Sequence, residues 1–369
     1  MIINFLSSTR ADFGIFLPLI KQIQNSHDLD YCLYTTGTHY SKEYGNSEKE
    51  IINNKIKIHR HINYSLENST SEELVFGQSE FITKFQKVIS RDKISHLVVL
   101  GDRFEIAFAA MVCAINGVKV IHLHGGEITL GALDNTFRKI ISICSNLHLT
   151  STDVYSTNLI ELGLDKNSIY NIGSLAVEEI VKIAKLNKHD PRLDLNIPEK
   201  SQYILATIHP ETKLSQEENL VNLNCVLNVT QKLTDFYFIF TGSNSDLLGK
   251  KYTDIIKGWC KEQRNCFFIH SLGSHNYILT ASKALTILGN SSSGIIEIPS
   301  LGVPTINLGK RQEGRLSAET VFHLPFNEKQ IVKTILAIQK ISNWDNTNPY
   351  FKKDSSQNAM NIIKAYLHD

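Results

Sequence analysis

The chain has 369 residues, and lysine plus arginine (38) nearly balances aspartate plus glutamate (37), which gives a formal net charge of +1 at pH 7. Because there is no basic surplus, the composition argues against nucleic acid or an anionic membrane surface as a partner, and any anion must be held by local donors. Apolar residues make up 42% and charged residues 20%, as in soluble globular proteins. The length is sufficient for two domains that each bury a core.

Cysteine usage predicts a reducing compartment. The six cysteines have no CxxC spacing and lie mostly in apolar segments, where a free cysteine behaves as a small core residue. No apolar run reaches the length of a membrane span, and the start, "MIINFLSSTRADFG", has the pattern of a first strand rather than of a signal peptide. We therefore expect a cytoplasmic protein.

Short apolar runs alternate with segments of helical periodicity along the whole chain. Runs such as "IINFLSS" and "HLVVLGD" predict strands in the first half, and "YILATIHP" begins a similar series in the second half. Helices are expected between the strands, for example over Ile15–Gln24, Leu74–Ser90 and Arg103–Asn116. This alternation predicts the α/β class, with parallel sheets covered by helices on both faces.

A polar stretch with two prolines, 186–202, interrupts this alternation. It predicts two Rossmann-like domains joined by a helix over 174–185, and a final helix over 356–368 that packs back towards the first domain. The predicted divisions are 1–173 for the first domain, 174–202 for the connecting helix and linker, 203–350 for the second domain and 351–369 for the C-terminal helix.

Polar residues gather where the predicted strands end. Ligands of open parallel sheets bind beyond the carboxyl ends of the strands, and two such edges facing each other would form one cleft for a small ligand. The polar residues at these ends are Arg10, His39, Asp102, His124, His209, Asn244 and Ser291 to Ser293.

The stretch "GNSSSGIIEIPSLGVPTINLG" predicts an anion site. A strand ends at Gly289, and Gly294 opens a helix whose first N–H groups, beside the serine hydroxyls, would hold a phosphate. Glu297, one turn into that helix, would accept hydrogen bonds from sugar hydroxyls, and Arg311 and Arg315 follow in "GKRQEGR". An ordinary serine helix cap is the alternative. The glycine-rich motifs of dinucleotide and P-loop sites are absent from the sequence.

Three further strand ends have both a functional and a structural interpretation. "GSNSD", 242–246, is either a ligand-binding turn or an ordinary Asx turn. In "STRADFG", Arg10 precedes a helix expected near Phe13 and either contacts phosphate or forms a surface salt bridge. In "GDRFE", Asp102 is a helix cap, a group facing the cleft, or both.

The stretch "HLHGGEITLGALDN", 122–135, concentrates titratable groups after an apolar run. His122 and His124 alternate along the expected strand, so their side chains would share one face about 6.6 Å apart. With Glu127 and Asp134 they form a candidate metal site, and a purely structural role is a second alternative. Acid–base chemistry beside an anion site is the interpretation that we favour.

Five segments in series, "SSTRAD", "GDRFE", "HLHGGEITLGALDNTFRKIIS", "TIHPET" and "GNSSSGIIEIPSLGVPTINLGKRQEGR", resemble the hydrolysing UDP-N-acetylglucosamine 2-epimerases of sialic acid biosynthesis. The resemblance extends from Arg10 to about Val321. It implies a glycosyltransferase-B-like fold with the active site in the interdomain cleft, UDP held by the second domain, no metal, no cofactor and a homo-oligomer (a dimer or tetramer).

The resemblance also implies a reaction and a set of residues. UDP leaves by elimination across C1–C2 to give 2-acetamidoglucal, and water then adds to release N-acetylmannosamine. The implied catalytic residues are Asp102, His124, Glu127, Asp134 and His209. The implied UDP- and substrate-binding residues are Arg10, His39, Asn244, Asp246, Ser271, Ser291, Ser292, Gly294, Glu297 and Arg311.

One position departs from the family pattern. Relatives commonly carry a glutamate 22 residues after the "GD" aspartate, where this chain has His124. Either His124 takes over the proton transfer or Glu127 replaces the missing carboxylate. Two rival functions also stay open: the same reaction on UDP-2,4-diacetamido-2,4,6-trideoxyglucose in legionaminic acid biosynthesis, and a glycosyltransferase of the same fold.

Overall fold

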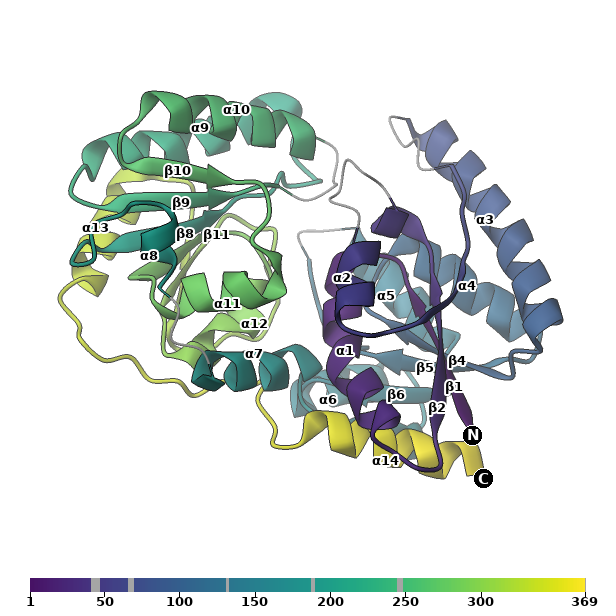
Figure 1. Cartoon of the computed structure of the whole chain (residues 1–369). Helices are drawn as coiled ribbons and strands as arrows, with labels where there is room; N and C mark the ends of the chain where they lie inside the picture. The colour runs from purple at the N-terminus through teal and green to yellow at the C-terminus, as the bar shows by residue number, and fades with distance from the viewer. Residues whose placement is uncertain (41–46, 66–69, 131–132, 187–189, 244–247, 369) are drawn as a thin grey trace. The chain divides into compact units, whose positions relative to one another are not determined.

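The computed structural model describes residues 1–40, 47–65, 70–130, 133–186, 190–243 and 248–368. The chain forms two compact units (Figure 1). The first unit contains Met1–Ile128, Leu133–Glu178 and Lys352–Asp369, and the second contains Thr129–Ala132 and Glu179–Phe351. Both units are α/β, as the sequence predicts.

The first unit is built on a seven-stranded parallel sheet of order β3-β2-β1-β4-β5-β6-β7. Its strand order reverses between β1 and β4, which is where ligands bind in open sheets of this kind. The strands are β1 (Ile2–Ser7), β2 (Asp30–Thr35), β3 (Ile58–His61), β4 (His96–Leu100), β5 (Lys119–Leu123), β6 (Leu147–Thr150) and β7 (Ile169–Asn171). The helices are α1 (Arg10–Gln24), α2 (Glu48–Asn53), α3 (Ser71–Asp92), α4 (Phe104–Ile115), α5 (Asp134–Ile143), α6 (Asp153–Glu161) and α14 (Ser355–His368). Helix α7 (Leu175–Leu186) begins in the first unit and continues into the second, which starts at Glu179.

The second unit has a six-stranded parallel sheet of order β10-β9-β8-β11-β12-β13, which reverses between β8 and β11. Its strands are β8 (Tyr203–Thr207), β9 (Tyr237–Thr241), β10 (Cys266–Ile269), β11 (Thr286–Gly289), β12 (Thr305–Leu308) and β13 (Val321–Leu324). Its helices are α8 (Pro191–Asp194), α9 (Gln216–Lys232), α10 (Gly249–Glu262), α11 (Gly273–Ser282), α12 (Ser293–Ile296) and α13 (Glu328–Ile338).

Two helices begin earlier than the apolar periodicity predicts. α1 begins at Arg10 because Thr9 and Asp12 form a capping box, in which each side chain accepts a hydrogen bond from the backbone N–H of the other. α3 begins at Ser71 through the same arrangement of Thr70 and Glu73. The expected start near Phe13 is therefore wrong, and Arg10 lies on the first turn of the helix.

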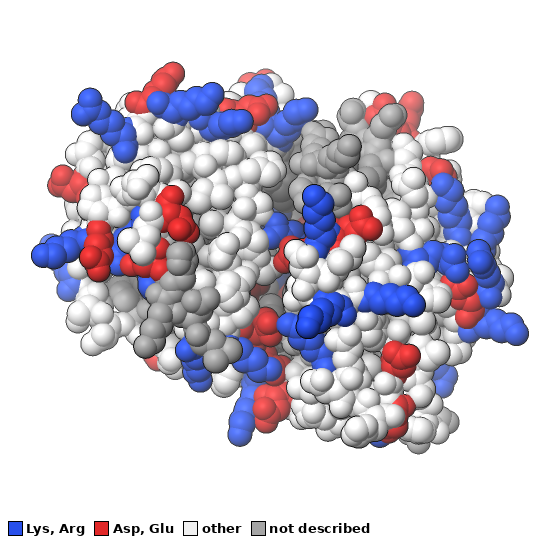
Figure 2. Space-filling view, viewed as in Figure 1, with Lys and Arg blue, Asp and Glu red and all other residues white. Residues whose placement is uncertain are grey.

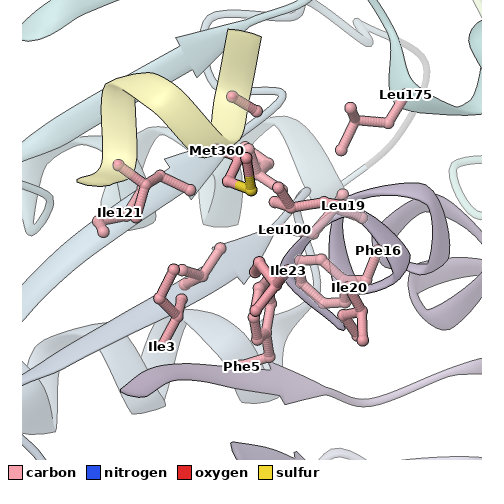
Figure 3. Close-up of a cluster of buried hydrophobic side chains, with 14 of the residues drawn as sticks. Ile3, Phe5, Phe16, Leu19, Ile20, Ile23, Leu100, Ile121, Leu175 and Met360 are labelled. Atoms are coloured by element: carbon pink, nitrogen blue, oxygen red, sulfur yellow. The ribbon is translucent and has the colours of Figure 1, made fainter. Parts of the chain in front are cut away.

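The central strand β4 of the first unit is buried on both faces, so successive residues enter different cores. Val98 of β4 packs in the cluster that contains α1, whereas its neighbours Leu97 and Val99 pack against α3 and α4. Met360 and Ile363 of α14 lie in the same cluster as Val98, and Figure 3 shows Met360 among the side chains of the sheet and α1. The C-terminal helix is thus part of the core of the first unit.

The surface carries both signs of charge. On the face shown in Figure 2, acidic and basic side chains are interspersed, in keeping with the near-zero formal charge. Within the described ranges, no helix has the length and apolar character needed to cross a membrane.

The core position of α14 gives a first prediction. Ile363→Ala removes a fully buried side chain, so it should lower the free energy of unfolding by about 2–5 kcal/mol in urea denaturation. Ile143→Ala, at a side chain that is 61% exposed in the same unit, is the matched control and should stay within about 0.5 kcal/mol of the parent. Equal stability of the two variants would contradict the assignment of α14 to this core.

Candidate active site

The turn after β4 carries Asp102, whose carboxylate forms an ion pair with Arg138 of α5. The Arg138 side chain is only 2% exposed, while that of Asp102 is 25% exposed. The N-terminal cap of α4 is Arg103, so Asp102 is not the helix cap that the sequence left as one alternative. Its carboxylate instead lies at the carboxyl end of β4, where it is paired with the buried guanidinium of Arg138.

Arg138 also joins two other parts of the predicted site. Its Nη1 donates a hydrogen bond of 3.0 Å to the backbone carbonyl of Glu127. Asp134 precedes Arg138 by four residues on α5, so both side chains lie on one face of that helix. One buried cation therefore fixes the Asp102 carboxylate, the loop after β5 and the helix that carries Asp134.

The two histidines of the 122–135 stretch do not share a strand face, contrary to the sequence-based expectation. β5 ends at Leu123, and His124 adopts a left-handed backbone conformation with φ of +62°. His122 is engaged at both ring nitrogens, by the Gly101 carbonyl at 2.9 Å and the Ser142 hydroxyl at 3.1 Å. Burial lowers the pKa of His122 to about 3, so the ring is neutral and serves the fold.

These positions argue against a metal at this stretch. Nε2 of His122 donates to a carbonyl, and Nδ1 accepts from a hydroxyl, which leaves neither nitrogen for a shared coordination sphere with His124. Within the part of the chain that the structure describes, no group of three or more histidine, cysteine or acidic side chains is arranged to hold a metal ion.

The left-handed turn at His124 is held by close packing of the glycines that follow. The N–H of His124 still donates to the Leu149 carbonyl of β6 at 2.9 Å, so the turn begins in register with the sheet. Gly126 has φ of +79°, and a methyl group there would collide with the Tyr155 carbonyl of α6. A non-glycine residue in this conformation costs about 1–3 kcal/mol, and such residues cluster at functional sites.

His124 and Glu127 contact each other across this turn. Nδ1 of His124 lies 3.3 Å from Oε1 of Glu127, and the Ser151 hydroxyl donates to the same oxygen at 3.0 Å. Both side chains are almost completely buried, at 6% and 3% exposure. The structure thus brings together the two residues between which the sequence left the proton-transfer role open.

The ends of β1 and β2 carry Arg10 and His39. Arg10 contacts Glu50 of α2 at 2.6 Å and is 30% exposed. The ring of His39 is completely buried between the Ser7 and Ser47 hydroxyls, at 2.9 and 2.8 Å, and burial lowers its pKa to about 3. A substrate contact for either residue stays a prediction, and His39 already uses both nitrogens within the protein.

In the second unit, Asn290 joins the ends of β8 and β11. Its side-chain amide accepts from the His209 N–H and donates to the His209 carbonyl, both at 2.8 Å. The Asn290 carbonyl in turn accepts from Gln312 at 3.0 Å and Arg311 at 3.4 Å. This arrangement places His209 and Arg311 beside the strand reversal of this sheet. Gly289 is required there, because a methyl group at its φ of +147° would collide with the Thr207 carbonyl.

The serine-rich segment differs in one respect from its prediction. α12 begins at Ser293 and ends at Ile296, so Gly294 does not open the helix and Glu297 lies at its C-terminal end. Ser293 donates to Glu297 at 3.1 Å and lies 3.0 Å from the Tyr277 hydroxyl. Ser291 and Ser292 remain partly exposed just before the helix.

Three predicted binding residues remain: Ser271, Asn244 and Asp246. The Ser271 hydroxyl accepts from the Gly273 N–H at 3.4 Å, at the start of α11. Asn244 and Asp246 lie outside the described residues.

Sequence reasoning missed Arg138, Ser151, Asn290 and Glu211. Arg138 looks like an ordinary surface arginine in "NTFRKIIS", although its place four residues after Asp134 is a usable signal. Glu211, within "TIHPET", is buried and accepts from the Lys310 N–H at 2.9 Å, and burial raises its pKa. It anchors the segment that carries Arg311.

The chain is similar to known proteins over most of its length. Residues 21–364 match the family model of UDP-N-acetylglucosamine 2-epimerase. Polysialic acid biosynthesis protein P7 of Escherichia coli is 33% identical, over 99% of this chain and 94% of its own length. GDP/UDP-N,N'-diacetylbacillosamine 2-epimerase (hydrolyzing) of Campylobacter jejuni is 34% identical, over 88% of this chain and 85% of its own length.

A solved structure shows the same fold. UDP-GlcNAc 2-epimerase from Neisseria meningitidis, bound to UDP-GlcNAc, superposes over 100% of both chains with a TM-score of 0.83 at 18% identity. The two parallel sheets thus have the glycosyltransferase-B architecture, which confirms the predicted fold class. The chain belongs to the UDP-N-acetylglucosamine 2-epimerase family, and the resemblance seen in the sequence is confirmed.

The ion pair gives a second prediction. Asp102→Asn removes the counter-charge of a buried guanidinium, so it should lower the free energy of unfolding by about 1–3 kcal/mol. The double variant Asp102→Asn/Arg138→Gln lacks both charges and should be less destabilised than the sum of the single variants, by at least about 0.5 kcal/mol. Strict additivity in urea denaturation would show that the pair has no energetic role.

Proposed function

We propose that this protein is a hydrolysing UDP-N-acetylglucosamine 2-epimerase of bacterial sialic acid biosynthesis. It would convert UDP-N-acetylglucosamine and water to N-acetylmannosamine and UDP. The observation that carries the proposal is the buried network of Asp102, Arg138, Glu127 and His124 at the carboxyl ends of β4 and β5. The relative from Escherichia coli, whose name places it in polysialic acid biosynthesis, supports the pathway.

The chemistry requires charge stabilisation at two places. The C2 proton of the sugar is not next to a carbonyl and is barely acidic, so departure of UDP should lead and leave cationic character at C1. The C2–H electron pair then forms the C1–C2 double bond of the glycal as a base takes the proton. In the second step a water oxygen bonds to C1, and a proton returns to C2 on the opposite face.

The first unit supplies groups for the sugar ring. Asp102 and Asp134 are carboxylates that can stabilise positive charge as UDP departs. His124 and Glu127 supply the acid–base pair for the C2 proton. The fixed geometry matters because preorganised groups need no reorganisation during the reaction.

The second unit supplies groups for UDP. Arg311 and the backbone of His209 both hydrogen-bond to Asn290. Ser291 and Ser292 follow Asn290 in the chain and precede α12. Cationic and hydroxyl donors in this arrangement suit a diphosphate whose negative charge grows as it leaves. Arg10, Ser271 and Glu297 are the further contacts that we expect for the nucleotide and the sugar.

A second candidate is the same reaction on UDP-2,4-diacetamido-2,4,6-trideoxyglucose. The name of the relative from Campylobacter jejuni favours it. The two substrates differ at sugar C4, where an acetamido group replaces the hydroxyl, and at C6, where a methyl group replaces the hydroxymethyl group. The cytoplasmic location and the homo-oligomer expected from the sequence stay predictions.

Turnover of the two nucleotides tests the proposal. With each nucleotide in turn, UDP release and the free sugar should be measured together. We expect UDP and N-acetylmannosamine from UDP-N-acetylglucosamine, with kcat/KM at least about tenfold above that for the diacetamido nucleotide, which corresponds to about 1.4 kcal/mol. A higher kcat/KM for the diacetamido nucleotide would select the second candidate. A new UDP-sugar without free sugar would exclude hydrolysis, and a requirement for an acceptor would indicate a glycosyltransferase.

Nucleotide affinity gives a separate prediction. Arg311→Ala removes a charged donor to phosphate, worth about 1.5–3 kcal/mol, so the Kd of UDP should rise about 10- to 100-fold in calorimetry. Ser291→Ala and Ser292→Ala should each raise it by a smaller factor. Arg264→Ala, at an exposed arginine of the same unit, is the matched control and should leave the Kd unchanged. An unchanged Kd in all three test variants would remove this segment from the UDP site.

A further inference from the structure

The contacts of His124 determine which ring nitrogen carries a proton. Nδ1 lies 3.3 Å from Oε1 of Glu127, and that oxygen also accepts from the Ser151 hydroxyl at 3.0 Å. An ionised carboxylate only accepts hydrogen bonds, so a proton on Nδ1 is the arrangement that suits this approach. In the neutral ring, the lone pair is therefore on Nε2.

Nε2 of His124 is the atom that the protein leaves unused. The side chain is 6% exposed, yet Nε2 has no hydrogen-bond partner among the residues that the structure describes. Buried polar atoms are nearly always hydrogen-bonded, and an exception indicates a catalytic or other functional role. His122, two residues earlier, is the contrast, because protein groups engage both of its nitrogens.

The backbone fixes the direction of this ring. The left-handed conformation at His124 turns the side chain off the path of β5, and the packing of Gly126 against α6 holds the turn. Arg138 donates a hydrogen bond to the Glu127 carbonyl. This contact fixes the backbone of Glu127, whose carboxylate faces His124. The pair is thus held by contacts within the first unit, as efficient proton transfer requires.

Building on the proposed function, we propose that His124 and Glu127 form a catalytic dyad. Nε2 of His124 takes the proton from sugar C2 in the elimination, while Glu127 is a positioning residue that fixes the tautomer and balances the charge of the imidazolium. The C2–H electron pair becomes the C1–C2 double bond, and the C1–O electron pair leaves with UDP. The imidazolium then passes its proton to solvent, and the proton that returns to C2 comes from the opposite face.

His124→Asn is the most direct variant. The asparagine amide nitrogen takes the place of Nδ1 and keeps a donor for Glu127, but no atom replaces Nε2. Asparagine also adopts the left-handed conformation readily, so the turn should survive. We expect UDP release and washout of deuterium from C2 of labelled substrate to fall about 10²–10⁴-fold, with the Kd of UDP and the melting temperature unchanged. His27→Asn, at an exposed histidine of the same unit, is the matched control.

Glu127→Gln tests the positioning role. The neutral amide no longer balances the imidazolium, so kcat should fall while KM for the nucleotide stays close to that of the parent. Residues that act as one unit are strongly non-additive, so the double variant His124→Asn/Glu127→Gln should be no slower than His124→Asn alone. A merely structural role of Glu127 would not produce this pattern.

The outcomes separate the dyad from the proposed function. If the parent protein releases UDP and the His124→Asn variant does so at the same rate, the dyad is wrong and the proposed function stands. A double variant slower than His124→Asn by the full factor of Glu127→Gln would also overturn the dyad alone, since the two residues would then act independently. A parent chain that releases no UDP from either nucleotide would overturn the proposed function and the dyad with it.

Discussion

The guanidinium of Arg138 lies almost fully buried in the first unit, where it contacts the Asp102 carboxylate and the Glu127 carbonyl. A buried charge is tolerated only when it is paired and hydrogen-bonded, so these contacts constrain both partners. The turn after β4, the loop after β5 and the helix α5 are consequently held together by one side chain. The positions of the Asp102 carboxylate and of the loop that carries Glu127 depend on this cation.

In the second unit, a neutral amide joins the ends of two strands. The amide of Asn290 satisfies the backbone of His209, and the Asn290 carbonyl receives Arg311 and Gln312. The buried Glu211 carboxylate, which accepts from the Lys310 N–H, anchors the segment that carries Arg311. The two units thus use different chemistry at equivalent places, the strand reversals of their sheets. On the proposed function, the first unit would supply carboxylates for a developing cation and the second would supply donors for a leaving anion.

The sequence predicts the layers of the fold better than the contacts of the site. Continuous apolar strands such as "HLVVL" are buried on both faces, and this period-free pattern is visible without a structure. The helix start at Arg10 was missed because Thr9 and Asp12 look like loop residues until their reciprocal hydrogen bonds are seen. The prediction that His122 and His124 share one strand face was wrong, because alternation assumes an extended backbone and the backbone at His124 is left-handed. The spacing of Arg138 from Asp134 hints at a shared helix face, but its burial depends on residues 36 and 11 positions away in the chain, which the sequence does not show.

Solvent isotope tracing tests the central claim, that UDP leaves by C–O cleavage with loss and return of the C2 proton. The reaction is run in D₂O and, separately, in water enriched in ¹⁸O, and both products are examined by mass spectrometry and NMR. The account predicts N-acetylmannosamine with deuterium at C2 and UDP that contains no ¹⁸O. A product that retains the original C2 proton, or UDP that carries ¹⁸O from attack on phosphorus, would contradict it.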